Sequence, residues 1–198
     1  MVYGAKNQLT HEDDTSPPLD NQGTKLIQGI ADALLYYGRA VDNKSLVGLS
    51  SNWSHQAVAM ERTKEAINQI LDYCATYPAD GILYRSSNMV LCAHSDTGVN
   101  NKSKGCSREG SHIFLSKKYA MPQWNGSVLT LAQIIKFVMS SASEAEPRAI
   151  FITAQKMLAV RNALDEMKYP QPKPKTPMVF FYTSTTIYLT CLLLEDRT

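Results

Sequence analysis

The stretch 88–97 constrains the fold of this chain more than any other. Its sequence, Asn-Met-Val-Leu-Cys-Ala-His-Ser-Asp-Thr, has five consecutive apolar residues and a carboxylate near its end. Such a run predicts a buried β-strand that carries Asp96 to the edge of a sheet. Because side chains alternate along a strand, His94 and Asp96 are expected to share one face. Leu91 and Ala93 are then expected on the opposite face.

Asp96 is the first candidate functional residue. A carboxylate at the end of an apolar strand is costly to bury alone, so it needs a cation, a hydrogen-bond donor or water. Asp96 is therefore a candidate metal ligand. The alternative interpretation is a turn-forming aspartate ahead of Gly98.

Composition narrows the class of protein. With 198 residues, 44% of them hydrophobic, the chain can form one hydrophobic core or two small ones. A formal net charge of +2 is too small to indicate a nucleic-acid or membrane surface by itself. The four cysteines form no Cys-x-x-Cys pair, and the N-terminus lacks the apolar run of a signal peptide. We therefore expect a reducing compartment, the cytosol or the nucleus.

The first part of the chain is expected to be helical. Residues 1–22 carry acidic and proline residues without a hydrophobic period and predict a flexible segment. Residues 23–78 are expected to form a helical segment. Within it, apolar spacing predicts one helix from about residue 26 to Gly38 and another over 54–76, which Pro78 ends.

Strand-like composition follows. A short strand over 81–84 is expected to pair with the 88–97 strand in a hairpin. The polar and basic stretch 98–110 predicts a loop, and 111–115 the next strand. The window 127–139 is too continuously apolar to separate strand from helix by period, but its β-branched residues favour a strand.

A helix is expected after this strand. Residues 140–146, Ser-Ser-Ala-Ser-Glu-Ala-Glu, contain Ser141 with Glu144 and Ser143 with Glu146, both at the spacing of a capping box. The pattern predicts a helix from there to about Met167. A start at Ser143 would place Glu146 in the first turn, where the helix dipole favours a glutamate of any role.

Three motifs in this order resemble the ribonuclease H portion of copia-type retrotransposon polyproteins. They are His-Ser-Asp at 94–96, Ser-Arg-Glu-Gly at 107–110 followed by His-Ile-Phe-Leu at 112–115, and the 140–146 segment. Upstream, residues 28–37, His55 and the 66–73 helix resemble the connection between the reverse transcriptase and that ribonuclease. The resemblance spans about 23–177.

The resemblance implies an α/β fold, a ribonuclease H-like mixed sheet flanked by helices over 79–177 and incomplete at its C-terminal end. Such enzymes cleave the RNA strand of RNA–DNA hybrids with two Mg²⁺ (or Mn²⁺) ions held by carboxylates. By motif position, Asp96 and Glu146 match the catalytic, metal-binding acids, with Glu144 as the substitute for Glu146. The implied partners are an RNA–DNA hybrid and the polymerase portion of the same polyprotein.

The chain departs from the family where a third carboxylate is expected. After Pro177 the residues 179–186 are Val-Phe-Phe-Tyr-Thr-Ser-Thr-Thr, and no acid follows before Glu195. Loss of one carboxylate should impair metal binding and activity steeply. Our hypothesis is that the divergent apolar tail, 178–198, derives from a frameshift, altered splicing or decay. A catalytically inactive remnant with weak nucleic-acid binding or a structural role is therefore the alternative function.

Further residues carry weaker signals. Lys102, Lys104 and Arg108 are candidate phosphate contacts, and the alternative is a solvated loop. Trp124 is a candidate stacking residue. A membrane is not an expected partner, because the apolar run 178–194 is at the short limit for a span. An edge strand or an aggregation-prone tail is favoured there over a tail anchor.

A zinc site is a further alternative. Cys92, His94, Cys106 and His112 could form a ligand set, but their spacings match no structural zinc finger. We favour core and loop positions for them.

Overall fold

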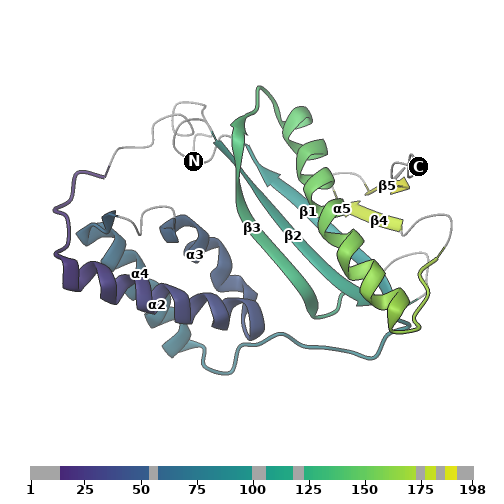
Figure 1. Cartoon of the computed structure of the whole chain (residues 1–198), viewed down its shortest axis with the longest axis horizontal. Coiled ribbons are helices and arrows are strands. Elements are labelled where there is room, and N and C mark those ends of the chain that lie inside the picture. Colours follow the sequence, from purple (N-terminus) through teal and green to yellow (C-terminus); the bar gives the residue numbers. More distant parts are fainter. Residues whose placement is uncertain are drawn as a thin grey trace. The chain divides into compact units, whose positions relative to one another are not determined.

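The computed structural model describes residues 14–53, 58–99, 106–117, 123–172, 177–181 and 186–190 (Figure 1). The chain divides into two units, 1–82 and 83–198. The sequence predicts this boundary slightly earlier, after residue 78. We refer to the two parts as the helical unit and the sheet unit.

Amphipathic helices build the helical unit. Its elements are α2 (Asn21–Ala40), the 3₁₀ helix η1 (Asn43–Ser45), α3 (Leu46–Trp53) and α4 (Glu61–Thr76). α2 begins where the Asp20 side chain accepts a hydrogen bond of 2.7 Å from the Gly23 N–H. The buried apolar side chains that hold the helices together are Ile27, Ala31, Leu34, Leu49, Ala59 and Ile67.

The helical predictions are confirmed in outline and wrong in detail. The second helix ends at Thr76 as expected, but it begins at Glu61; residues 54–57, with His55, lie outside the described part. The helix α3 was not predicted. Residues 14–20, expected to be flexible, are held against the start of α4 by the bonds Leu19 N–H to Ala59 O (2.9 Å) and Glu61 N–H to Pro17 O (3.0 Å).

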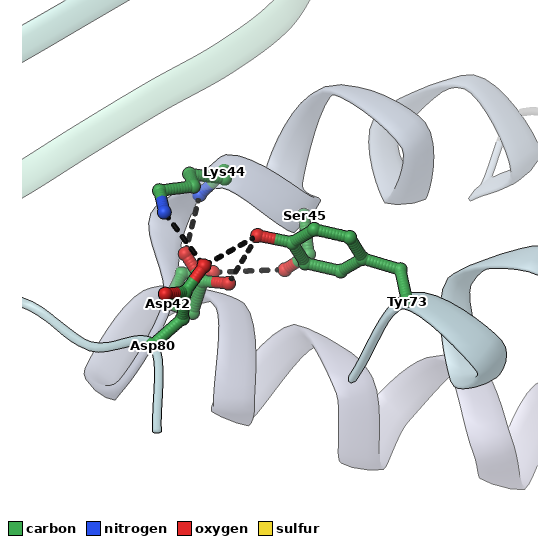
Figure 2. A network of polar contacts seen from close by, with 5 residues as sticks. All are labelled: Asp42, Lys44, Ser45, Tyr73 and Asp80. Carbon is green, nitrogen blue, oxygen red and sulfur yellow. Dashed lines mark hydrogen bonds and ion pairs between the residues drawn. The ribbon is translucent and has the colours of Figure 1, made fainter. Parts of the chain in front are cut away.

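A polar cluster joins η1 to the end of α4 and to the segment that follows α4 (Figure 2). The Tyr73 hydroxyl lies 3.1 Å from a carboxylate oxygen of both Asp42 and Asp80. Lys44 forms an ion pair of 2.7 Å with Asp80, and its backbone N–H bonds to Asp42. We call Asp42, Lys44, Ser45, Tyr73 and Asp80 the tyrosine cluster. It joins α4 and the segment after it to η1.

The sheet unit contains a three-stranded antiparallel sheet in the order β1-β2-β3 (Figure 1). The strands are β1 (Val90–Gly98), β2 (Cys106–Ser116) and β3 (Ser127–Val138), and α5 (Ala142–Glu166) follows them. A second, two-stranded sheet pairs β4 (Pro177–Phe181) with β5 (Thr186–Thr190), and β4 lies close to β1. The α/β class is therefore confirmed.

One face of the three-stranded sheet is covered by α5. The buried residues at this contact are Leu91, Ala93, Ile113, Ala154, Met157 and Leu164. The predicted alternation along β1 is thus confirmed, because Leu91 and Ala93 are core residues under α5. After α5 the chain returns to β1, where the Gln171 side chain accepts from the Leu91 N–H (2.9 Å) and donates to Met89 O (2.9 Å).

Several strand predictions need correction. Residues 81–84 form no strand; the Ile82 N–H instead bonds to Val41 O at 2.7 Å. β1 pairs with β2, which begins at Cys106, so the end of the predicted 98–110 loop belongs to the sheet. The 127–139 window is a strand, as predicted. All pairs between described strands are antiparallel, and the mixed sheet stays a prediction.

The predicted apolar tail contains part of β4 and all of β5, while 182–185 and 191–198 lie outside the described residues. No helix in the described ranges has the length and apolar character that a membrane crossing requires.

Candidate active site

Asp96 and Glu146 come from the end of β1 and the second turn of α5. Asp96 is exposed, and its Oδ1 accepts a hydrogen bond of 2.7 Å from the Thr97 N–H. Glu146 is half-buried. Burial is the main cause of a raised pKa of Glu146, and the negative charge of Asp96 is the second cause. The charge of Asp96 therefore acts on Glu146, although the two acids are 50 positions apart in the sequence.

The two glutamates at the start of α5, Glu144 and Glu146, have different roles. The N-cap is Ser141, so Glu144 lies in the first turn and Glu146 beyond it. Glu144 accepts hydrogen bonds from the Ser140 N–H (2.8 Å) and hydroxyl (2.7 Å), and these bonds lower its pKa. Glu144 thus serves as a local cap, whereas Glu146 interacts with Asp96. Pro147 lies inside the helix, where its missing N–H removes one intrahelical bond.

Of the three predicted phosphate contacts, Arg108 lies within the described residues. Arg108 is 8% exposed within β2, and burial lowers its pKa. Such a position does not favour contact with a phosphate backbone. Lys102 and Lys104 lie outside the described residues.

Trp124 belongs to an aromatic layer together with two histidines and Phe114. The Trp124 ring stacks on His94 at 4.0 Å between centroids, and Phe114 lies 5.3 Å from His94. Burial, and then the charge of His112, lower the pKa of His94 to about 4. His94 is thus neutral at physiological pH and part of a packed layer.

The zinc alternative finds no support. Burial raises the pKa of the Cys92 thiol to about 11, which disfavours the thiolate that zinc needs. Within the described ranges, no three His, Cys, Asp or Glu residues are grouped as metal ligands. For the same reason, Asp96 and Glu146 have no third acid beside them in this part of the chain.

Sequence reasoning missed a buried acid on β2. Glu109 is fully buried on β2, facing α5. It accepts hydrogen bonds from Ser111, Thr153 and Gln133. The signal was present in the alternation Glu109, Ser111, Ile113, because residues two apart share one face of a strand. It was lost because residues 98–110 were assigned to a loop.

Comparison of the chain with protein-family models, with curated proteins and with solved structures gives no match.

Proposed function

We propose that the sheet unit is a retrotransposon-derived ribonuclease H-like module that binds a divalent cation between Asp96 and Glu146 and cleaves the RNA strand of RNA–DNA hybrids slowly. The observation that carries this proposal is the electrostatic effect of Asp96, at the end of β1, on Glu146, near the start of α5: the charge of Asp96 adds to the burial that raises the pKa of Glu146. The order of the motifs along the sequence supports it.

The residues fit a hard divalent cation. Carboxylate oxygens are the ligands that Mg²⁺ prefers, and the mutual repulsion of Asp96 and Glu146 is relieved when a cation lies between them. When bound, the ion supplies Lewis-acid activation of water and stabilises the leaving oxygen. The chain's own contribution is to hold two carboxylates at fixed positions, one on a strand and one on a helix.

The site is incomplete by the standard of the resemblance. The strand expected to bring the third carboxylate follows the proline-rich link, and β4 is the strand at that position, close to β1. Its sequence, Pro-Met-Val-Phe-Phe, has no acid. With one carboxylate fewer, charge neutralisation is weaker, and we expect turnover at least roughly 10²-fold below that of a complete site. This observation also favours the second candidate, an inactive remnant.

Cleavage of an end-labelled RNA strand paired with DNA tests the proposal, with Mg²⁺ and Mn²⁺ titrated separately. We expect slow, metal-dependent cleavage that Asp96→Asn and Glu146→Gln each abolish. Glu144→Gln is the matched control, because it lies on the same helix but bonds to Ser140; it should retain activity. Absence of cleavage with measurable Mn²⁺ binding would favour the inactive remnant. Absence of both overturns the proposal.

A further inference from the structure

Glu109 is a carboxylate enclosed by neutral donors. Its Oε1 accepts hydrogen bonds from the Ser111 hydroxyl (3.0 Å) and the Thr153 hydroxyl (3.1 Å). Its Oε2 accepts one from the Gln133 side-chain amide (2.8 Å). A carboxylate shielded from water needs such donors to offset its desolvation. Because they come from β2, α5 and β3, Glu109 binds three elements together.

The same cluster reaches β1. The Thr153 hydroxyl also lies 3.2 Å from the Ser95 hydroxyl. Ser95 directly precedes Asp96 on β1. Glu146 lies seven residues before Thr153 on α5, which is about two helical turns and therefore the same face. The cluster thus attaches both segments that carry the candidate acids.

We propose that Glu109 is a positioning residue: through Thr153 and Ser95 it fixes the end of β1 relative to α5 and holds Asp96 and Glu146 where one divalent cation can bind both. This inference rests on the proposed function. Glu109 itself does not contact the ion. It acts on the geometry of the two acids.

Apolar packing alone would not give this geometry. An aliphatic side chain at position 109 would fill the space between β2 and α5 without a desolvation cost, and such replacements of buried charges are often neutral or stabilising. It would not bind polar groups of α5 and β3 at defined angles. The carboxylate therefore contributes orientation between elements, which a binding site for a small cation requires.

The substitution Glu109→Gln tests the role with little change of shape. A glutamine cannot accept from Gln133 and from the two hydroxyls at once, because one of its two terminal atoms is a donor. We expect Mn²⁺ to bind roughly tenfold more weakly to this variant, as is common when a group behind metal ligands is changed. The affinity is measured by calorimetry or electron paramagnetic resonance, well below the unfolding temperature.

A swapped double variant separates positioning from general stability. Glu109 and Gln133 are cross-strand partners, so Glu109→Gln combined with Gln133→Glu restores a donor–acceptor pair with the carboxylate on the other strand. The amide oxygen introduced at position 109 can then accept from Ser111 and Thr153. We expect the swap to bring Mn²⁺ affinity back to within about twofold of the original chain. A merely structural role would lower the unfolding temperature of the single variant and leave its affinity unchanged.

Two outcomes overturn the inference. One is a folded Glu109→Gln variant with unchanged Mn²⁺ affinity. The other outcome concerns an original chain that binds no Mn²⁺, in which case the proposed function fails. Amide hydrogen exchange of residues 95–97 then tests whether Glu109 still positions the end of β1. Exchange that is faster in the single variant and recovers in the swap supports positioning by Glu109, and equal exchange in all three proteins overturns it.

Discussion

Each unit of the molecule contains a polar cluster with carboxylate groups, and the carboxylates of the two clusters are stabilised by different partners. In the helical unit, Asp80 pairs with the Lys44 ammonium, whose side chain is 63% exposed, so water and salt reach this ion pair. In the sheet unit, Glu109 is fully buried and accepts hydrogen bonds from neutral hydroxyl and amide groups.

This difference in partners predicts how much each cluster contributes to the stability of its unit. An exposed ion pair contributes little to stability because solvent screens it and two long side chains lose entropy. A buried acceptor of several hydrogen bonds contributes more when intact, and its loss leaves buried donors without partners. Removal of Glu109 should therefore cost far more than removal of any single group in the tyrosine cluster.

The largest effect is expected for Glu109→Ala. The substitution leaves the donors of Ser111, Thr153 and Gln133 without this acceptor and creates a cavity, so the free energy of unfolding should fall by about 3 kcal/mol or more. Urea unfolding measures it. Glu166→Ala, an exposed glutamate at the end of α5, is the control and should change little. A loss below about 1 kcal/mol would remove the contrast between the two clusters.

Much of the frame of the sheet unit could be predicted because it follows local patterns. The apolar run in 88–97 predicts β1, and the β-branched residues of 127–139 favour β3. The Ser and Glu residues of 140–146 predict the start of α5, although the predicted capping boxes do not form: the N-cap Ser141 makes no side-chain cap bond, and Glu144 bonds to Ser140 instead. Asp96 could be selected as a candidate because a carboxylate ends an apolar strand. Its interaction with Glu146 was expected only through the resemblance, since no local rule joins residues 50 apart.

The rest depends on tertiary contacts. A polar and basic stretch such as 98–110 predicts a loop, yet β2 begins within it because pairing with β1 and β3 satisfies its backbone. Glu109 is tolerated under α5 because Ser111, Gln133 and Thr153 donate to it, and the last two lie 24 and 44 residues later in the chain. Similarly, the basic stretch around Arg108 predicts a phosphate contact, but Arg108 is buried in the fold. Hydrophobic patterns assume apolar residues on inner faces, so they miss a buried acid that has partners.

A smaller effect is expected in the helical unit for Tyr73→Phe. The substitution removes the hydroxyl that contacts both Asp42 and Asp80, which is worth about one ordinary hydrogen bond, or roughly 4 °C in the unfolding temperature of a unit of this size. Circular dichroism at 222 nm follows the transition. Tyr77→Phe, an exposed ring 5.3 Å from that of Tyr73, is the matched control and should have less effect. Equal shifts in both variants would show that the hydroxyl bonds contribute nothing.

The smallest effect concerns the sign of pH dependence. Without a metal ion, the raised pKa of Glu146 means that the folded state holds its proton more tightly than the unfolded state. The stability that this group contributes is therefore lost as pH rises through the raised pKa. Asp80 has the opposite sign: hydrogen bonding to Lys44 lowers its pKa, so its contribution is lost as pH falls.

This difference in sign can be measured by substitution in the presence of a chelator. At pH 7, Glu146→Gln should raise the unfolding temperature of the sheet unit by about 1–2 °C, and the gain should vanish near pH ~3.5, where glutamate is protonated in both states. Asp80→Asn should lower that of the helical unit at pH 7. With Mn²⁺ added, the original chain should gain stability and Glu146→Gln should not, because ligand binding stabilises only a state that has the site. A gain from Glu146→Gln that persists at low pH would show that the charge of Glu146, which burial and the charge of Asp96 disfavour, is not its cause.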